Sequence, residues 1–289
     1  MKTIEEVLYR VPNTKAEDWH QHSNGSGWVY YSASVADSAY VGPDALVLDN
    51  AQVSGNARVL GNARVSGDAQ VSGNARVSGD AVVYGDARVF DNARVSGDAW
   101  VSGDAQVSGD ARVYGDAWVY GNARVSDNAQ VYGDAKVYGD AKVYGDAQVL
   151  DNARVFGDAW VSGYAQVSGD AQVSGNARVS GDARVFGDAQ VYGNAVVSGD
   201  AWVKSPLYIQ GSRHPVTLCS HTKIAIGCQV HKISYWKKKY KAIGVAEGYS
   251  PSEIREYGEY ITLLAKAARR LTKCVQGTKT QRNQQRRKR

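Results

Sequence analysis

Cysteine is scarce in this sequence and long apolar segments are missing. The three cysteines, Cys219, Cys228 and Cys274, all lie in the last third of the chain, and so sparse and odd a set predicts reduced thiols rather than a disulfide framework. No stretch of about 18 apolar residues occurs and the N-terminus has no apolar signal region, so neither a membrane span nor a secretory signal is expected. We therefore expect a soluble, cytoplasmic protein.

Histidine is missing from the central part of the chain, and net positive charge is confined to the last part. No histidine lies between His22 and His214, so the central part offers no imidazole base. Residues 1–203 hold 15 Lys/Arg against 25 Asp/Glu, a net charge of −10, whereas residues 204–289 hold 19 against 4, a net charge of +15. The two parts therefore differ in kind, and the second is suited to a polyanionic partner.

A six-residue repeat fills most of the chain. From Ala33 to Ala201 an alanine occurs at every sixth position, 29 times without a miss, and a valine follows two residues after each one, from Val35 to Val203. The consensus is Ala-x-Val-x-Gly-Asp/Asn. Ala and Val share one face of a short strand and x points to the other face, while the remaining residues form a turn that tolerates positive φ.

A short strand followed by a turn in every hexad predicts a triangular coil of three hexads. The 171 residues of the repeat, at 18 per coil, give 9.5 coils, and a spacing of about 4.8 Å makes the rod roughly 45 Å long. Inward valines and continuous backbone ladders then stabilise a one-dimensional solenoid. In four hexads Asp replaces the turn Gly and Asn always follows it, which either avoids adjacent carboxylates or reflects recent duplication.

The repeat resembles the hexapeptide-repeat superfamily, in which an aliphatic residue is followed four residues later by a small one, as in Val53 with Ala57. This resemblance implies a left-handed parallel β-helix. The flanking segments HSNGSGWV, AYVGPDA and IGCQVHKISYW are similar to uncharacterised phage and prophage hexapeptide-repeat proteins that are labelled putative transferases. Acyltransferases of the superfamily commonly carry a protruding loop and an interfacial histidine base, and the repeat of this chain has neither.

Four regions are predicted along the chain. Residues 1–32 form an N-terminal cap, residues 33–203 the left-handed β-helix, residues 204–273 a small α+β capping domain, and residues 274–289 a basic disordered tail. In the capping domain the segments PLYIQG, HPVTLCS, TKIAIGCQV and KISYW favour an antiparallel meander. A helix is expected after Ser250, where a capping box precedes a stripe of apolar residues.

Outward residues 18 apart should stack into columns on the rod. One column is an arginine ladder formed by Arg58, Arg76, Arg94 and Arg112. It is open to two interpretations: a solvated face whose charges the turn Asp residues offset, or a linear site for a bridging phosphate or carboxylate. Further anion-binding candidates lie at the end of the basic tail and are Arg286, Arg287, Lys288 and Arg289.

Aromatic residues gather on a second column and its adjoining corner. They are Trp100, Trp118, Tyr84, Tyr120, Tyr138 and Phe156. An exposed apolar patch of this kind suits self-association or partner binding, whereas cross-coil stacking would only stabilise the ladder.

Two pairs of soft ligands occur in the capping domain. Cys219, His221, Cys228 and His231 could hold zinc, although their spacing is not that of a standard zinc finger. A nucleophilic pair of Cys228 and His231 is a second interpretation. Buried cysteines with structural histidines are the third and the one we favour, so neither a metal nor a cofactor is predicted.

These observations lead to a non-enzymatic rod of the phage or prophage type. We expect it to form homo-oligomers through its aromatic face in the cytoplasm of a bacterial host and to present its basic domain to a host protein. One alternative is a hexapeptide-repeat acyltransferase, which would need an interfacial histidine and an acyl-donor pocket. Another is a nucleic-acid or nucleotide-binding module that uses the arginine ladder and the tail.

Overall fold

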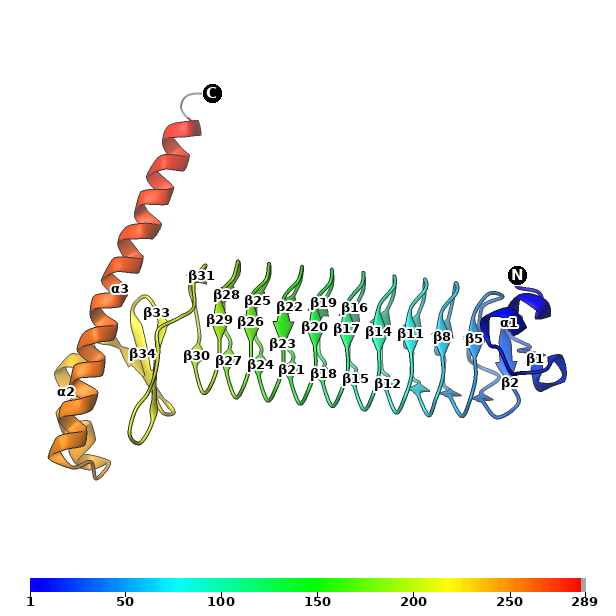
Figure 1. The fold of residues 1–289 in the computed structure, drawn as a ribbon, viewed down its shortest axis with the longest axis horizontal. Coiled ribbons are helices and arrows are strands. Elements are labelled where there is room, and N and C mark those ends of the chain that lie inside the picture. The colour runs from blue at the N-terminus through cyan, green and yellow to red at the C-terminus, as the bar shows by residue number, and fades with distance from the viewer. Residues whose placement is uncertain (287–289) are drawn as a thin grey trace.

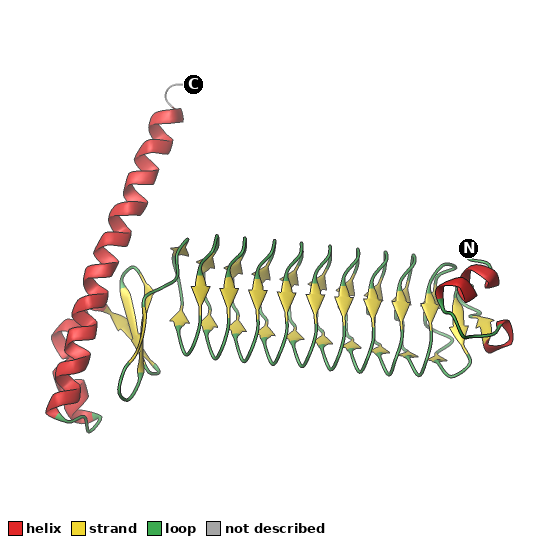
Figure 2. Ribbon diagram, in the orientation of Figure 1, coloured by secondary structure: helices red, strands yellow, loops and turns green. Residues whose placement is uncertain are grey.

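The computed structural model describes residues 1–286, with side chains as far as Arg270. The repeat forms a long straight rod with a small cap at the N-terminal end and a mixed α/β domain at the other end (Figure 1). Three parallel sheets make up the three sides of the rod, and each coil adds one short strand to each sheet (Figure 2). The chain is thus a parallel β-solenoid of about ten coils, as the hexad spacing predicts.

The three sheets are called A, B and C here. Sheet A has eleven strands, β1 (Trp19–Gln21), β2 (Trp28–Tyr30), β5 (Leu46–Val47), β8 (Arg64–Val65), β11 (Val82–Val83), β14 (Trp100–Val101), β17 (Trp118–Val119), β20 (Lys136–Val137), β23 (Arg154–Val155), β26 (Gln172–Val173) and β29 (Gln190–Val191). Sheet B has ten strands, β3 (Ser34–Val35), β6 (Gln52–Val53), β9 (Gln70–Val71), β12 (Arg88–Val89), β15 (Gln106–Val107), β18 (Arg124–Val125), β21 (Lys142–Val143), β24 (Trp160–Val161), β27 (Arg178–Val179) and β30 (Val196–Val197). Sheet C also has ten strands, β4 (Tyr40–Val41), β7 (Arg58–Val59), β10 (Arg76–Val77), β13 (Arg94–Val95), β16 (Arg112–Val113), β19 (Gln130–Val131), β22 (Gln148–Val149), β25 (Gln166–Val167), β28 (Arg184–Val185) and β31 (Ala201–Trp202).

The core of the rod contains only the small residues of the repeat. Every repeat Ala and Val from Ala39 to Val197 is at most 1% exposed, because the two share the inward face of each short strand. Each strand pairs with the strand three hexads further along the chain, as Arg76 does with Arg94, so the side chains of one column keep the same direction along the rod. The inward assignment of Ala and Val is confirmed over this range.

The corners of the coils require positive φ at the fifth residue of the hexad. Gly55 has φ +65°, and a Cβ atom there would lie 2.9 Å from the carbonyl oxygen of Gly73 in the next coil. Asp replaces glycine at four corners with φ between +57° and +61°, namely Asp49, Asp91, Asp127 and Asp151. Asp is among the few non-glycine residues that tolerate this region.

Each of these four Asp residues joins two coils. The carboxylate of Asp49 accepts a hydrogen bond of 2.9 Å from the backbone N–H of Gly67, and the other three make the same contact at 3.0–3.2 Å. The amide of the following Asn50 donates to Asp68, one coil further on, at 3.2 Å. An Asp in place of Asn50 would remove this donor and put a carboxylate against that acid. Acids do follow one another 18 residues apart elsewhere, as at Asp98 and Asp116, so the avoidance of adjacent carboxylates stays a prediction.

The N-terminal cap closes one end of the rod. Helix α1 (Ile4–Arg10) begins with a capping box between Thr3 and Glu6, and the 3₁₀-helix η1 (Ala16–Asp18) follows it. Strand β1 adds an antiparallel strand to the edge of sheet A. Next to it, the backbone N–H of Gly27 donates to the carbonyl of Val41 on the edge of sheet C, which satisfies part of an edge that would otherwise be open.

The last hexad departs from the predicted register. Strand β31 pairs Val185 with Trp202 instead of Val203, and the positive φ lies at Asp200 instead of at Gly199. Trp202 is therefore buried and Val203 is 58% exposed, so the prediction that Val203 points inward is wrong. The larger Trp side chain covers the open end of the valine core, which a further Val would leave exposed.

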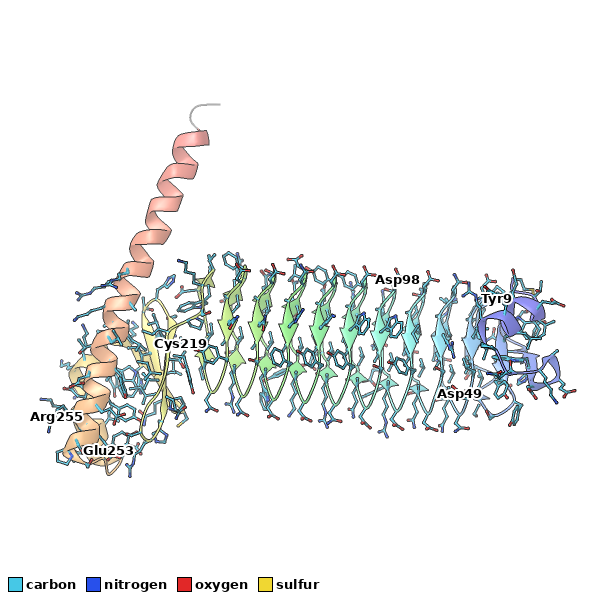
Figure 3. All side chains as sticks on the ribbon, in the orientation of Figure 1. Tyr9, Asp49, Asp98, Cys219, Glu253 and Arg255 are labelled. Carbon is cyan, nitrogen blue, oxygen red and sulfur yellow. The ribbon has the colours of Figure 1, made fainter. Side chains whose placement is uncertain are left out.

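A four-stranded antiparallel meander, sheet D, follows the rod. Its strands are β32 (Tyr208–Gln210), β33 (Pro215–Ser220), β34 (Lys223–Ile226) and β35 (Gln229–Lys232). The backbone N–H of Ser198 at the end of the rod donates to the carbonyl of Cys219 at 3.1 Å, and Figure 3 shows Cys219 in sheet D on the side of the rod. The core of the rod therefore continues into the C-terminal domain.

Two helices cover the outer side of sheet D. Helix α2 (Ile233–Ala246) begins inside the segment KISYW, so the prediction of a strand there is wrong. Its β-favouring residues Ile233, Trp236 and Tyr240 lie three and four positions apart, and this spacing places them on one face of a helix. Helix α3 (Pro251–Arg286) starts with the predicted Ser250–Glu253 capping box and continues as helix into the region expected to be a disordered tail.

No helix among residues 1–286 has the length and apolar character that crossing a membrane requires.

Candidate functional sites

The arginine ladder lies on sheet C with all four guanidinium groups exposed. Strand pairing aligns Arg58, Arg76, Arg94 and Arg112 in consecutive coils. No carboxylate of a described residue lies within 4.0 Å of these groups, so direct ion pairs with the turn Asp residues do not offset their charge. Guanidinium groups stacked in this way could share a carboxylate or phosphate through paired N–H donors.

The corner that precedes the ladder carries amides in three coils and carboxylates at Asp91 and Asp110. The amides belong to Asn56, Asn74 and Asn92. The amide of Asn74 donates to the side-chain oxygen of Asn92 at 3.2 Å. Acids also stack on the corner that follows the ladder, where Figure 3 shows Asp98 at the surface. The ladder therefore has acids on both neighbouring corners, more of them on the corner that follows it, and those acids weaken its field toward a long polyanion.

The predicted aromatic residues form two stacks along the rod. Trp100 and Trp118 are stacked at 5.1 Å between ring centroids with an interplanar angle of 6°. Tyr120, Tyr138 and Phe156 stack at 4.8 and 5.0 Å on the adjoining corner. The structure therefore brings these predicted residues together in two columns, and their spacing of three hexads is the reason.

Neighbouring side chains cover much of the tryptophan stack. Tyr84 meets Trp100 edge-on at 5.9 Å, and the Lys136 ammonium lies 5.1 Å from the centre of the Trp118 ring. Trp100 is 38% exposed and Trp118 40% exposed. The stack gives cross-coil contacts of the kind that stabilise a ladder, and the area that remains exposed is what a partner could cover.

Sequence reasoning missed two other aromatic contacts. Tyr114 and Tyr132 stack at 4.8 Å at the corner after sheet C. Trp160 on sheet B lies between the Lys142 ammonium, 4.7 Å from its ring centre, and the Arg178 guanidinium at 5.2 Å. The same spacing of three hexads is the signal in the sequence that could have identified both.

The structure does not assemble Cys219, His221, Cys228 and His231 into one site. Among the described residues no group of three potential metal ligands converges. Cys219 is fully buried and burial raises the pKa of its thiol, whereas Cys228 is exposed at the turn between β34 and β35. The expectation of a buried cysteine is therefore confirmed for Cys219 and wrong for Cys228.

The two histidines of this set also point to different neighbours. The His221 Nδ1 atom lies 3.7 Å from a carboxylate oxygen of Asp200. The His231 ring packs on Tyr235 at 4.4 Å and on Trp236 at 5.2 Å. No contact in the described part of the chain joins His231 to Cys228, so the arrangement does not support a nucleophilic pair.

The α2–α3 hairpin separates positive from negative charge. The four acids of residues 204–289 are Glu247, Glu253, Glu256 and Glu259, and all lie at or near the turn between the helices. The remaining length of the hairpin carries an exposed basic surface formed by Lys237, Lys238, Lys241, Lys266, Arg269 and Arg270, and Lys237 and Arg269 come together at its open end. None of these six has a carboxylate of a described residue within 4.0 Å.

A surface groove of about 250 Å³ lies within this basic surface. Lys237 of α2, Arg269 of α3 and His221 of the β33–β34 turn line it. The anion-binding candidates of the tail, Arg286, Arg287, Lys288 and Arg289, lie outside the described side chains. Helix α3 nevertheless carries the backbone as far as Arg286 and projects beyond the width of the rod (Figure 1).

These features define a β-solenoid repeat protein whose capping domain is strongly basic. Eight segments of the chain match the family model described as YdcK beta solenoid repeat, and they cover residues 51–67, 69–85, 87–103, 105–121, 117–133, 147–163, 171–187 and 189–205. The rod therefore consists of β-solenoid repeats similar to those of this family. All eight segments begin and end in the rod or just after it, so the match concerns the repeat and not the capping domain. A search of curated proteins finds no match.

Proposed function

We propose that the protein is a binding rod without catalytic activity, which presents its C-terminal basic surface to a polyanion and in particular to nucleic acid. The observation that carries this proposal is the charge separation along the α2–α3 hairpin. Six exposed cations of the hairpin have no ion pairs to described residues, Lys237 and Arg269 share one groove, and two of the acids nearer the turn already have partners. Glu253 pairs with Arg213 at 3.2 Å and Glu256 accepts hydrogen bonds from Ser212.

The position of the basic surface favours a long ligand. The surface lies at the end of the rod, where helix α3 extends away from the solenoid and adds Lys273, Lys279 and Arg282 in sequence. A row of cations without nearby acids binds phosphates through counterion release, and this binding does not depend on base sequence. Tyr235 and Trp236 at the start of α2 add aromatic groups to the region, although Trp236 is buried and unavailable for base stacking.

Two further parts of the proposal rest on the sequence. Self-association through the aromatic face would give several basic domains per particle and so raise avidity for a long polyanion. A phage or prophage origin is carried by the resemblance of the flanking segments alone. Acyl transfer is not proposed, since no histidine occurs on the repeat and the described corners bear no protruding loop.

The test is binding to a DNA duplex and to single-stranded RNA at several salt concentrations. Lys237→Gln with Arg269→Gln should reduce affinity for both and lower the slope of log affinity against log salt by about 0.7–0.9 for each phosphate that is no longer bound. Truncation after Gly277 should have a similar effect. The matched control is Arg76→Gln with Arg94→Gln, which also removes two exposed positive charges but leaves the basic domain intact.

The outcome separates the two basic features of the chain. We expect the control to bind nearly as the parent does, because acids border the arginine ladder. If affinity for nucleic acid decreases more in the control than in the Lys237/Arg269 variant, the binding site is the arginine ladder. Absence of binding by the intact protein at low salt, where such contacts are strongest, would refute the proposal.

A further inference from the structure

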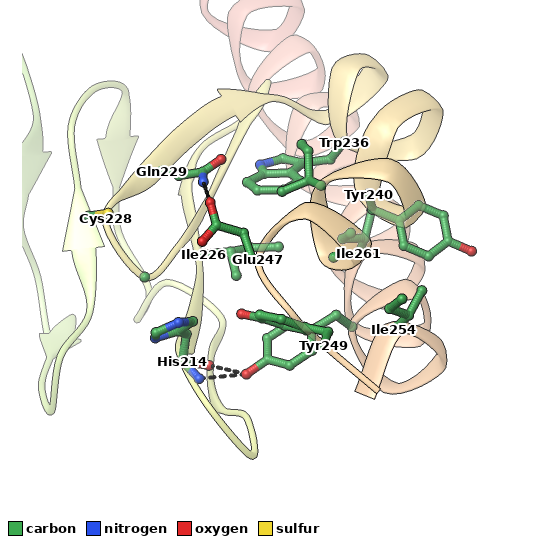
Figure 4. A pocket seen from close by; sticks show the side chains of 14 residues that line it. His214, Ile226, Cys228, Gln229, Trp236, Tyr240, Glu247, Tyr249, Ile254 and Ile261 are labelled. Carbon is green, nitrogen blue, oxygen red and sulfur yellow. Dashed lines mark hydrogen bonds between the residues drawn. The ribbon is translucent and has the colours of Figure 1, made fainter. Parts of the chain in front are cut away.

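A cavity of about 120 Å³ lies between sheet D and the α2–α3 hairpin, at the acidic end of the domain and apart from the groove of Lys237 and Arg269. Figure 4 shows its aromatic side chains facing a carboxylate across the space. Its walls are largely aromatic and aliphatic, and Cys228, Gln229, His214 and Glu247 contribute the polar groups. A largely apolar pocket with few polar groups is the usual form of a small-molecule site.

The aromatic walls are fixed before any ligand enters. Trp236 is 3% exposed and its indole N–H donates to the carbonyl of Ile224 at 2.8 Å. Tyr257 is also 3% exposed, and its hydroxyl accepts from the backbone N–H of His214 at 2.6 Å and donates to the carbonyl of the same residue at 3.0 Å. The polar atoms of Trp236 and Tyr257 therefore already have hydrogen-bond partners, and these two rings can contact a ligand only through their π systems.

Tyr249 adds a wall at an angle to Tyr257. The two rings lie 5.2 Å apart between centroids with an interplanar angle of 65°. The Arg213 guanidinium lies 4.8 Å from the centre of the Tyr249 ring and forms an ion pair with Glu253. This ring therefore already accepts one cation, and the charge of that cation is compensated by a carboxylate outside the cavity lining.

Glu247 is an exposed residue whose carboxylate forms no ion pair with a described residue, and the Arg213 guanidinium donates instead to the backbone carbonyl of Glu247 at 3.2 Å. The side-chain Oε1 atom of Glu247 accepts a hydrogen bond of 3.1 Å from the amide of Gln229. No cationic group of a described residue lies within 4.0 Å of the carboxylate. A charged oxygen with one neutral donor beside aromatic walls favours a cation over an anion or a neutral ligand.

We propose that this cavity binds a quaternary ammonium group of the choline type. Such a cation has no N–H donors and needs no array of acceptors, which the satisfied walls could not provide, whereas a primary ammonium has three donors to satisfy. Its methyl groups suit apolar contact and its charge suits ring faces and one carboxylate. For comparison, an engineered cavity of about 150 Å³ accepts benzene, so a compact ligand matches the space.

The inference does not depend on polyanion binding and is tested with choline itself. Binding of choline and of its neutral isostere 3,3-dimethyl-1-butanol to the full chain would be measured at pH 8 by calorimetry and by NMR. We expect choline to bind at least about tenfold more tightly than the neutral alcohol. Glu247→Gln should lower the affinity for choline by about the same factor and leave the affinity for the alcohol unchanged.

Two control variants separate a binding role from a structural one. Glu259→Gln removes an exposed acid of the same hairpin that does not line the cavity, and it should bind choline as the parent does. Gln229→Leu removes the hydrogen-bond donor to Glu247 without changing charge, and it should weaken choline binding less than Glu247→Gln does. Equal affinity for choline and the alcohol would overturn the proposal, as would unchanged binding in a folded Glu247→Gln variant or no binding of choline by the parent.

Discussion

The inward and outward positions of strand β19 allow a matched test of the solenoid core. Val131 is fully buried, whereas the adjacent Gln130 points outward and pairs in register with Arg112. Val131→Asp and Gln130→Asp therefore add the same charge one residue apart. The first places a carboxylate among valines that are at most 1% exposed, and the second places it beside an arginine.

The expected difference between the two variants is large. Loss of the buried Val131 side chain removes about 1.5–3 kcal/mol of transfer free energy, and an unpaired carboxylate in the interior costs several kcal/mol more. We therefore expect Val131→Asp to lower the free energy of unfolding by roughly 5 kcal/mol. Gln130→Asp should change it by about 0.5 kcal/mol or less, as is typical of surface substitutions.

The pH dependence gives this prediction a distinct signature. Burial raises the folded-state pKa of the introduced Asp above its unfolded value of about 3.9. The Val131→Asp variant should therefore be least impaired below pH 4 and should lose stability as the pH rises through and above that value, because the unfolded state then releases the proton first. Gln130→Asp should show no such loss.

Denaturant unfolding followed by circular dichroism at several pH values is the assay, and hydrogen exchange would show whether the coils next to position 131 open first. Solenoids unfold by neighbouring repeats, so local opening is expected before global loss of structure. Equal midpoints for the two Asp variants between pH 4 and 8 would refute the inward assignment of the repeat valines.

Two other predictions follow from the register and from the aromatic stacks. Deletion of three hexads, from Ala99 to Asp116, should leave a folded rod that is shorter by about 4.8 Å, whereas deletion of one hexad should rotate all later columns by a third of a turn; circular dichroism with small-angle scattering would detect either change. Trp100→Gln with Trp118→Gln should leave the solenoid folded and lower its oligomeric state in sedimentation, and a double variant that sediments as the parent does would assign the tryptophans to ladder stabilisation alone.

The sequence was sufficient to predict the solenoid because its hexad period is unbroken. Every column follows from counting three hexads, and the pairings of Arg76 with Arg94 and of Trp100 with Trp118 confirm the count. The prediction failed where the repeat ends. A shift of the strand register by one residue at Asp200 costs little free energy, because no further coil of the rod has to pair with this strand. Burial of Trp202 compensates for the change.

The capping domain was less predictable because tertiary contacts decide its local structure. The segment KISYW contains β-favouring residues and yet begins a helix. Trp236 packs against sheet D and its indole N–H donates a hydrogen bond to the carbonyl of Ile224, a contact that a helix allows. The cavity could not be predicted at all. Its walls come from His214 just before β33, from β34, β35 and the turn between them, and from both helices, and no spacing in the sequence links His214 to Glu247 or to Tyr257.

The opposite net charges of the two parts of the chain favour binding of a polyanion at one end of the molecule. Residues 1–203 carry a net charge of −10 and the remainder carries +15, so a polyanion is repelled along the solenoid and attracted at its C-terminal end. Within the terminal domain the choline-type cavity lies at the acidic turn and the groove of Lys237 and Arg269 at the open end of the same hairpin. Two ligands of opposite charge could therefore bind the domain without competing for one surface, and choline should leave the salt dependence of nucleic-acid binding unchanged.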